Sequence, residues 1–421
     1  MITNYFRKSV SIVLFLTLAS LAAPAGTITY RFIVGTASYQ QPALLTEVLP
    51  GVFYSYGASE VPFSVTPQGQ LTSLANFNPG TLQHPFVTGA NRRAYSTMGG
   101  ASSNVVSVGL SPGTKRVYAD LKLAAILLQN LPDGTLLGYG LNSTNYSLVK
   151  SDLQGTVTSF FQFPAGENVW SVLYATDGNY YGVSQPHNQY GYVFRLTPSG
   201  TLTKLLTIAA TNGPLLQGTD GNLYGATGAG GANNTGTIYK LALSGQYTLL
   251  YSFTTGANRI PYWLIEGSDG NLYGTTYGNG LAATLFQVTT SGQYTLINTM
   301  APSACACGLT LGSDGNIYGD ASGGGPSGAG FIFAVEGGFP KPAPRALQFR
   351  PQEGAVGSKV RIWGYNLFYA AVQFNGVAAT TVSNGGSNYV FATVPTGATT
   401  GPITVTTPGG TSTTTASFVV K

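Results

Sequence analysis

The six residues Asp220-Gly221-Asn222-Leu223-Tyr224-Gly225 recur along the chain. Close copies begin at Asp177, Asp269 and Asp314, and a weaker copy begins at Asp133. Successive copies start 43 to 49 residues apart, a period typical of solenoids and propellers. Gly adopts positive φ without strain and Asp hydrogen-bonds its own backbone, so each Asp-Gly pair predicts a tight turn. We interpret the five Asp residues as structural turn residues, because one carboxylate per turn does not make a calcium loop.

Each copy of the phrase belongs to a longer unit that predicts four β-strands. In the unit around Asp220, the strand-like segments cover residues 214–218, 222–227, 237–241 and 247–253. Apolar side chains that recur with a period of two are typical of strands with one buried face. Four strands in about 45 residues is the size of one propeller blade. The sequence therefore predicts an all-β fold that contains a β-propeller.

The N-terminus supplies the strand that the last unit lacks. Two degenerate copies, near Pro50 and Ala94, precede the five clear ones and bring the count to seven. The last copy ends after residues 331–335 without a fourth strand, whereas residues 27–32 resemble the fourth strand at 247–253. An N-terminal strand in the last blade would close the ring and remove its exposed edges. We predict a seven-bladed propeller closed by this strand; six blades remain possible if the second copy is not a repeat.

Composition agrees with an all-β protein and argues against a nucleic-acid partner. The 421 residues include 57 Gly, 12% aromatic residues and only 8% charged residues. Such a chain is too apolar for disorder and lacks the bias of a helical protein. Its few basic residues are scattered and form no stripe that could follow a phosphate backbone.

Residues 1–25 have the pattern of a signal peptide. Arg7 and Lys8 form a basic region, residues 12–22 an apolar one, and Ala23-Pro24-Ala25 offers small residues for cleavage. The apolar run is short for a membrane span and no stop-transfer pattern follows it. We expect a protein that is secreted, periplasmic or held at the cell surface, with no transmembrane segment after cleavage.

A second module follows the repeats. Residues 340–345 are rich in proline and predict a stiff linker after a propeller at 26–339. Residues 346–421 predict about six short alternating strands, as in an immunoglobulin-like β-sandwich without its cysteine pair. The segments 351–367 and 401–410 closely resemble the IPT/TIG domain, which implies a spacer or interaction module.

The repeats resemble the GloVer repeat family, whose units combine Gly-Asn-Leu-Tyr-Gly with a following Thr and a Gly-rich loop. Residues 221–227 and 270–276 match this pattern closely, and residues 315–319 nearly as well. The resemblance implies an exported bacterial protein with propeller-like repeats, and it implies no particular reaction.

Residues suited to catalysis are scarce. The two histidines, His84 and His187, lie in different repeats, and five of the 14 acidic residues lie in or beside repeat turns. Cys305 and Cys307 are two residues apart, where a disulfide would be strained, so we interpret them as small buried hydrophobes. We expect no cofactor and no metal. The alternative is a secreted lyase or hydrolase in which His187 works with a carboxylate such as Glu167.

The irregular loops offer a better candidate for function. Turns after the first and third strands of each blade share one end of the ring, and the variable connections gather at the other. Aromatic residues beside polar ones in those connections suit a polysaccharide or a cell-surface protein. Trp170 and Trp263 have the alternative role of filling the channel as core. The candidate binding residues are Glu167, Trp170, His187, Tyr190, Arg259, Tyr262 and Trp263.

Overall fold

The protein is all-β in every part that the computed structural model describes. Within those residues no helix is long and apolar enough to cross a membrane. The described residues are 27–36, 42–57, 62–74, 86–91, 93–98, 103–109, 115–121, 124–141, 145–154, 156–186, 190–254, 260–277, 282–300 and 306–421.

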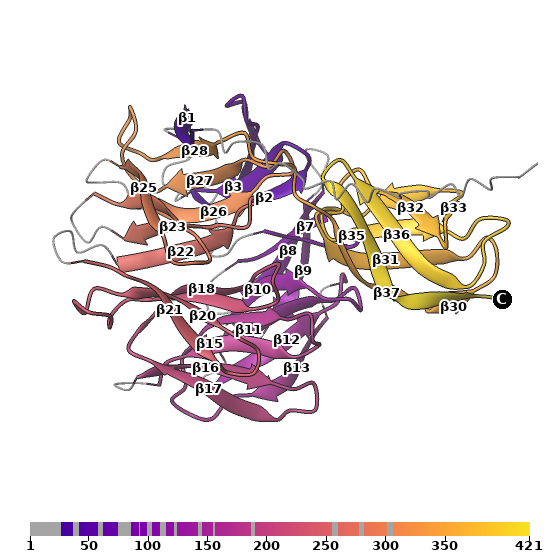
Figure 1. Ribbon diagram of the computed structural model, residues 1–421, viewed down its shortest axis with the longest axis horizontal. Helices are drawn as coiled ribbons and strands as arrows, with labels where there is room; N and C mark the ends of the chain where they lie inside the picture. The colour runs from indigo at the N-terminus through magenta and orange to yellow at the C-terminus, as the bar shows by residue number, and fades with distance from the viewer. Residues whose placement is uncertain are drawn as a thin grey trace, which may run out of the picture.

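The described residues before the linker form seven antiparallel sheets of four strands each (Figure 1). Within six of these sheets the strands pair in the order in which they occur in the chain. The strands of the first three sheets are β2 (Ala43–Leu49), β3 (Val52–Tyr56), β4 (Pro62–Val65) and β5 (Leu71–Ser73); β6 (Val87–Thr88), β7 (Arg93–Met98), β8 (Ser103–Gly109) and β9 (Lys115–Leu121); and β10 (Ala124–Asn130), β11 (Leu136–Leu141), β12 (Tyr146–Ser151) and β13 (Val157–Gln162).

The next three sheets contain the clearest copies of the repeated phrase, each copy at the turn between the first and second strands. Their strands are β14 (Val169–Tyr174), β15 (Tyr180–Ser184), β16 (Gly191–Leu196) and β17 (Leu202–Ile208); β18 (Thr211–Gln217), β19 (Leu223–Thr227), β20 (Thr237–Leu241) and β21 (Tyr247–Ser252); and β22 (Ile260–Glu266), β23 (Leu272–Tyr277), β24 (Thr284–Val288) and β25 (Tyr294–Thr299).

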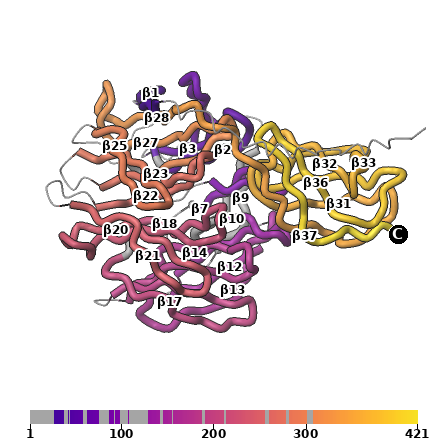
Figure 2. Tube along the Cα trace, in the orientation of Figure 1, coloured from indigo at the N-terminus to yellow at the C-terminus, as the bar shows by residue number. Residues whose placement is uncertain are grey.

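The seventh sheet joins the two ends of the repeat region. It contains β26 (Ala306–Leu311), β27 (Ile317–Ala321), β28 (Phe331–Glu336) and, at its edge, β1 (Thr29–Gly35). β1 pairs antiparallel with β28 as the sequence predicts, and Arg31 forms an ion pair with Glu336 across the two strands. β26 lies against β2 of the first sheet, so the ends of the repeat region meet (Figure 2).

The carboxylate of the repeated phrase organises each hairpin. In the copy at Asp220, Oδ1 accepts a hydrogen bond from the backbone N–H of Asn222 (3.0 Å). Oδ2 accepts from the Asn222 amide, the Tyr224 hydroxyl and the Lys240 ammonium, each at 2.8 Å. Burial alone would raise the pKa of Asp220, but these donors outweigh it and the pKa is lowered. The interpretation of this Asp as a turn residue agrees with these contacts.

The same contacts recur in the other close copies, at Asp177, Asp269 and Asp314, where a Tyr hydroxyl also donates to the carboxylate. In the weaker copy, Asp133 instead accepts from the backbone N–H and hydroxyl of Thr135.

The Gly that ends the phrase lets a large ring from the third strand pack onto the second. A Cβ at Gly225 would lie 2.3 Å from the hydroxyl oxygen of the buried Tyr239. Gly182, Gly274 and Gly319 face Phe rings in the same way. The repeated phrase is thus a packing unit, in which one residue makes the turn and another makes room for a neighbouring ring.

The C-terminal residues form two sheets that enclose a core of Val, Ile, Leu, Ala and Phe side chains. One sheet has four strands and the other has five. The strands are β29 (Arg345–Arg350), β31 (Lys359–Tyr365), β35 (Tyr389–Thr393) and β34 (Val382–Asn384) in the first sheet, and β30 (Glu353–Gly354), β37 (Gly410–Val420), β36 (Gly401–Thr407), β32 (Ala371–Phe374) and β33 (Val377–Ala378) in the second.

This C-terminal sandwich is docked directly on the repeat sheets (Figure 1). The buried Tyr389 donates its hydroxyl to the Leu131 carbonyl at 2.6 Å, in the turn between β10 and β11. Arg361 donates to the Pro132 carbonyl in the same turn (3.0 Å). The buried ring of Trp363 meets Tyr174, at the end of β14, edge to face. The sandwich therefore covers the end of the ring that carries the turns after the first strands.

We predict that Gly225→Ala lowers the free energy of unfolding by about 1–3 kcal/mol, because the added methyl group overlaps the Tyr239 ring. Urea denaturation of the purified protein measures the change. Gly35→Ala is the matched control, since a Cβ at this strand glycine meets no atom closer than 3.8 Å. Equal effects of the two substitutions would contradict the packing role of Gly225.

Candidate functional site

The two ends of the ring of sheets differ in what covers them. The first strand of each sheet ends at the turn that faces the sandwich, as Leu131 and Tyr174 illustrate. The first strands therefore begin at the opposite end, which we call the open end. In an antiparallel sheet the second strands finish and the third strands start at that same end. The candidate residues can form one site only if they lie together at the open end.

Trp170 and Tyr262 are directed to the open end by the same irregularity. The pairing of β14 with β15 slips between Val169 and Ser171, and that of β22 with β23 slips between Pro261 and Trp263. A β-bulge of this kind re-aims the side chain of the extra residue. Trp170 is consequently 57% exposed and Tyr262 37% exposed, although both lie on first strands.

In the sheet between β14 and β22, the corresponding position is a close backbone contact. On β18, residue Gly213 lies where its Cβ would be 1.7 Å from the Tyr262 carbonyl oxygen. Pairing of β18 with β19 is also interrupted there, between Asn212 and Leu216. Gly213 therefore lets the backbone of β18 approach that of β22 closely.

Two more aromatic side chains lie at the open end. Tyr190 immediately precedes β16 and is 70% exposed, and Tyr277 ends β23 and is 44% exposed. The Tyr277 ring centroid is 6.3 Å from that of Tyr262. Tyr190 was among the sequence candidates and Tyr277 was not. The repeated Gly-Asn-Leu-Tyr-Gly phrase could have located Tyr277, because it fixes where the second strand ends.

Glu167 lies on the connection between β13 and β14, shortly before Trp170. Its Oε2 accepts a hydrogen bond from the Ser184 hydroxyl at 2.5 Å. Burial, followed by the proximity of Glu167, raises the pKa of the nearby Tyr192 hydroxyl. Glu167, Trp170 and Tyr190 thus belong to one sheet, whereas Tyr262 belongs to the sheet two places further along.

Trp263 differs from the exposed candidates in its burial and its contacts. It is partly buried, and its indole N–H donates to the Leu309 carbonyl of the next sheet at 3.1 Å. It also lines a cavity of about 360 Å³ between the first strands, which Arg345 and Tyr365 of the sandwich border. Trp263 therefore packs between sheets at the edge of this cavity, whereas Trp170 is exposed to solvent.

Several sequence candidates lie outside the described residues, namely His84, His187, Arg259 and Cys305. Cys307 is described as part of β26, at the bulge between Ala306 and Gly308. In the described part of the chain no three His, Cys, Asp or Glu residues come together in a group that could hold a metal ion.

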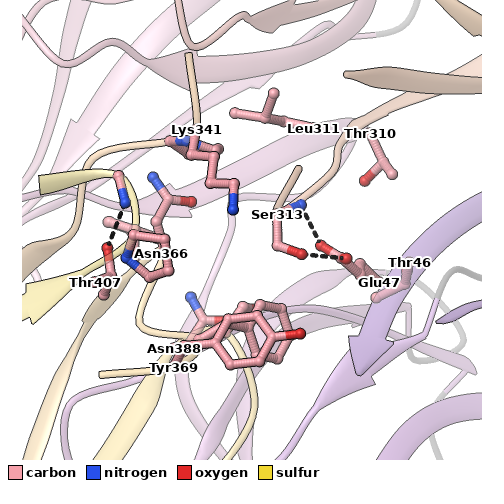
Figure 3. A pocket seen from close by; sticks show the side chains of 16 residues that line it. Thr46, Glu47, Thr310, Leu311, Ser313, Lys341, Asn366, Tyr369, Asn388 and Thr407 are labelled. Carbon is pink, nitrogen blue, oxygen red and sulfur yellow. Dashed lines mark hydrogen bonds between the residues drawn. The ribbon is translucent and has the colours of Figure 1, made fainter. Parts of the chain in front are cut away.

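A different pocket lies at the seam between the sandwich and the repeat sheets (Figure 3). Sequence reasoning did not find it, because its walls come from distant parts of the chain. On β2, Glu47 accepts hydrogen bonds from the backbone N–H and hydroxyl of Ser313 and from the Gly51 N–H, all at 2.7 Å. These bonds tie the first sheet to the last. Glu266 makes the same contact with Thr219 between two other sheets.

Comparison with known families and structures supports the repeat and the fold. Residues 132–333 match the model of the Gloeobacter/Verrucomicrobia repeat, so the GloVer resemblance is confirmed for that stretch. Among curated proteins none matches the chain.

Solved structures with the same architecture are β-propellers. A streptogramin B lyase aligns with a TM-score of 0.58 at 15% identity, over 75% of this chain and 100% of that one. An inactive virginiamycin B lyase from Staphylococcus aureus, bound to quinupristin, aligns with a TM-score of 0.59 at 14% identity, over 73% and 99%. The WD40 propeller domain of Doa1 aligns with a TM-score of 0.51 at 12% identity, over 72% and 96%. At such identities the likeness establishes the β-propeller fold and nothing about activity.

We predict that the seam makes stability depend on pH. Burial, only partly offset by the bonds from Gly51 and Ser313, raises the pKa of Glu47 from 4.5 to about 7. The folded protein therefore binds more protons than the unfolded chain between these two values, and stability should fall as pH rises through that window. Urea denaturation at steps from pH 4 to 8, compared with Glu47→Gln, isolates this contribution. A wild-type-minus-variant difference that stays constant with pH would refute it.

Proposed function

We propose that this chain is an exported, non-catalytic binding protein whose propeller recognises a carbohydrate or a cell-surface partner. In this proposal the seven sheets are the seven blades of a closed ring, and residues 346–421 are an immunoglobulin-like IPT/TIG domain. The observation that carries the proposal is the exposure of Trp170 and Tyr262 at bulges of first strands, with Tyr190 and Tyr277 at the same end.

Sugar rings fit this surface chemically. The faces of Trp and Tyr offer apolar area for the C–H groups of a sugar, and their polar edges remain in water. Glu167 beside Trp170 provides an acceptor for hydroxyl groups. Four exposed aromatic side chains share one end of the ring, and apolar area gathered at one end of a folded protein favours a binding role.

The sandwich contributes by closing the other end. Because it packs on the turns through Trp363 and Tyr389, a partner approaching the ring meets the open end. We infer that the sandwich acts as an interaction module fixed to the propeller. The signal-like residues 1–25 support a location at the cell surface, in the periplasm or outside the cell.

A lyase or hydrolase is the second candidate. It is favoured by Glu167, which lies beside Ser184 and Tyr192 at the open end, and by the lyases among the structures of similar fold. This reaction would need His187 as its acid or base, within hydrogen-bond reach of the substrate.

We predict that the mature protein is retained on at least one polysaccharide array or surface preparation and that Trp170→Ala with Tyr262→Ala weakens this retention at least ~10-fold. Each lost ring removes contact area worth more than ~1 kcal/mol at a hot spot. Affinity electrophoresis and biolayer interferometry measure the change. The matched control is Tyr247→Ala, which removes an exposed ring from the outer strand β21.

The outcome distinguishes the candidates. Retention that is lost in the double variant and kept in the control supports binding at the open end. Shortening of the retained polymer, abolished by His187→Ala, would establish the enzyme instead. Absence of retention on every polymer and surface would overturn the binding proposal.

A further inference from the structure

The seam pocket is a small, partly open space with walls from both parts of the protein. Its volume is about 180 Å³, below the range of about 300–1,000 Å³ that drug-sized ligands occupy. A single sugar ring or a molecule of similar size matches this space. One wall consists of residues from β2, β26 and the turn after β26. The other consists of Lys341 and Pro342 of the linker together with residues of the sandwich (Figure 3).

Most polar groups of the pocket are already engaged. The Glu47 carboxylate accepts from Ser313 and Gly51. The Asn388 amide donates to the Gly364 carbonyl, and its oxygen accepts from Ser387. These groups shape the walls and have little capacity left for a ligand.

Lys341 is the exception. Figure 3 shows its side chain reaching into the pocket from one side, with Ser313 and Glu47 on the other. Among the described residues its ammonium group forms neither an ion pair nor a hydrogen bond. A cation that is left unneutralised in a concave site attracts an anionic group.

The loop after β31 supplies further side chains to the pocket, and two of its residues have an unfavourable backbone conformation. Asn366 and Tyr369 both have positive φ, at 57° and 59°, and a bulky side chain adopts this conformation only when its surroundings require it. Tyr369 is nonetheless 62% exposed, and it borders the pocket with its ring. The Asn366 amide donates to the Ala343 carbonyl, which leaves its oxygen able to accept from a hydroxyl group.

We infer that the seam pocket binds a small hydroxylated carboxylate, of the size of one sugar acid. Lys341 would pair with the carboxylate, and Asn366 and Thr310 would meet hydroxyl groups. Leu311, Pro342 and Phe368 would contact the C–H faces. A phosphate dianion fits less well, because the pocket offers one cation for two negative charges.

Isothermal titration calorimetry on the mature chain tests the inference with four probes: sodium glucuronate, a disaccharide ending in glucuronate, glucose and inorganic phosphate. We expect saturable binding of glucuronate, at least ~10-fold tighter than that of glucose or phosphate. Lys341→Met should remove this preference while keeping the apolar stem of the side chain. Lys359→Met, which changes a lysine elsewhere on the sandwich, should leave it intact.

The remaining results of the titration decide which form of the ligand is bound and whether the inference holds. Equal binding of the disaccharide supports recognition of a chain end, and binding of glucuronate alone supports recognition of the free acid. Absence of saturable glucuronate binding, equal affinity for phosphate, or an unchanged affinity in Lys341→Met would overturn the inference. Trp170→Ala should have no effect on this titration, so its result is independent of the function proposed for the open end.

Discussion

Hydrogen bonds to the Asp carboxylate of the repeated phrase hold five of the seven inner hairpins, and the arrangement of the ring follows from them. Asp220 illustrates them: it accepts from a turn amide, a side-chain amide and a strand tyrosine at once. These bonds fix where the first strand stops and where the second begins. Side chains along a strand point alternately to its two faces. The position of the turn therefore decides which residues of the second strand face the neighbouring sheets.

The two ends of the ring have different roles, because the Asp turns lie at one end only. The turns are short and similar, so they form a surface on which a second domain can pack, and Tyr389 anchors the sandwich there through the Leu131 carbonyl. The other end of each first strand is free of that constraint. Bulges at Trp170 and Tyr262 change the local register there and expose rings that a regular strand would have turned elsewhere.

The sequence predicted what depends on local chemistry. The Asp-Gly turns, the four strands around Asp220 and the pairing of the N-terminal strand with residues 331–336 all follow from turn residues and a period of two. It could not separate Trp170 from Trp263, because a single bulge residue decides which ring points to solvent. The contacts between the repeats and the sandwich do not recur from unit to unit, so neither the docking surface around Trp363 nor the seam pocket at Lys341 could be predicted.

The central claim is that recognition takes place at the end of the ring opposite the sandwich. A crystal structure of the mature protein with a bound oligosaccharide, chosen from the polymer that retains it, tests this claim most directly. Sugar rings should stack against Trp170 or Tyr262, on the side away from the sandwich. Sugar bound only along the outer strands, or only on the turns next to the sandwich, would contradict it.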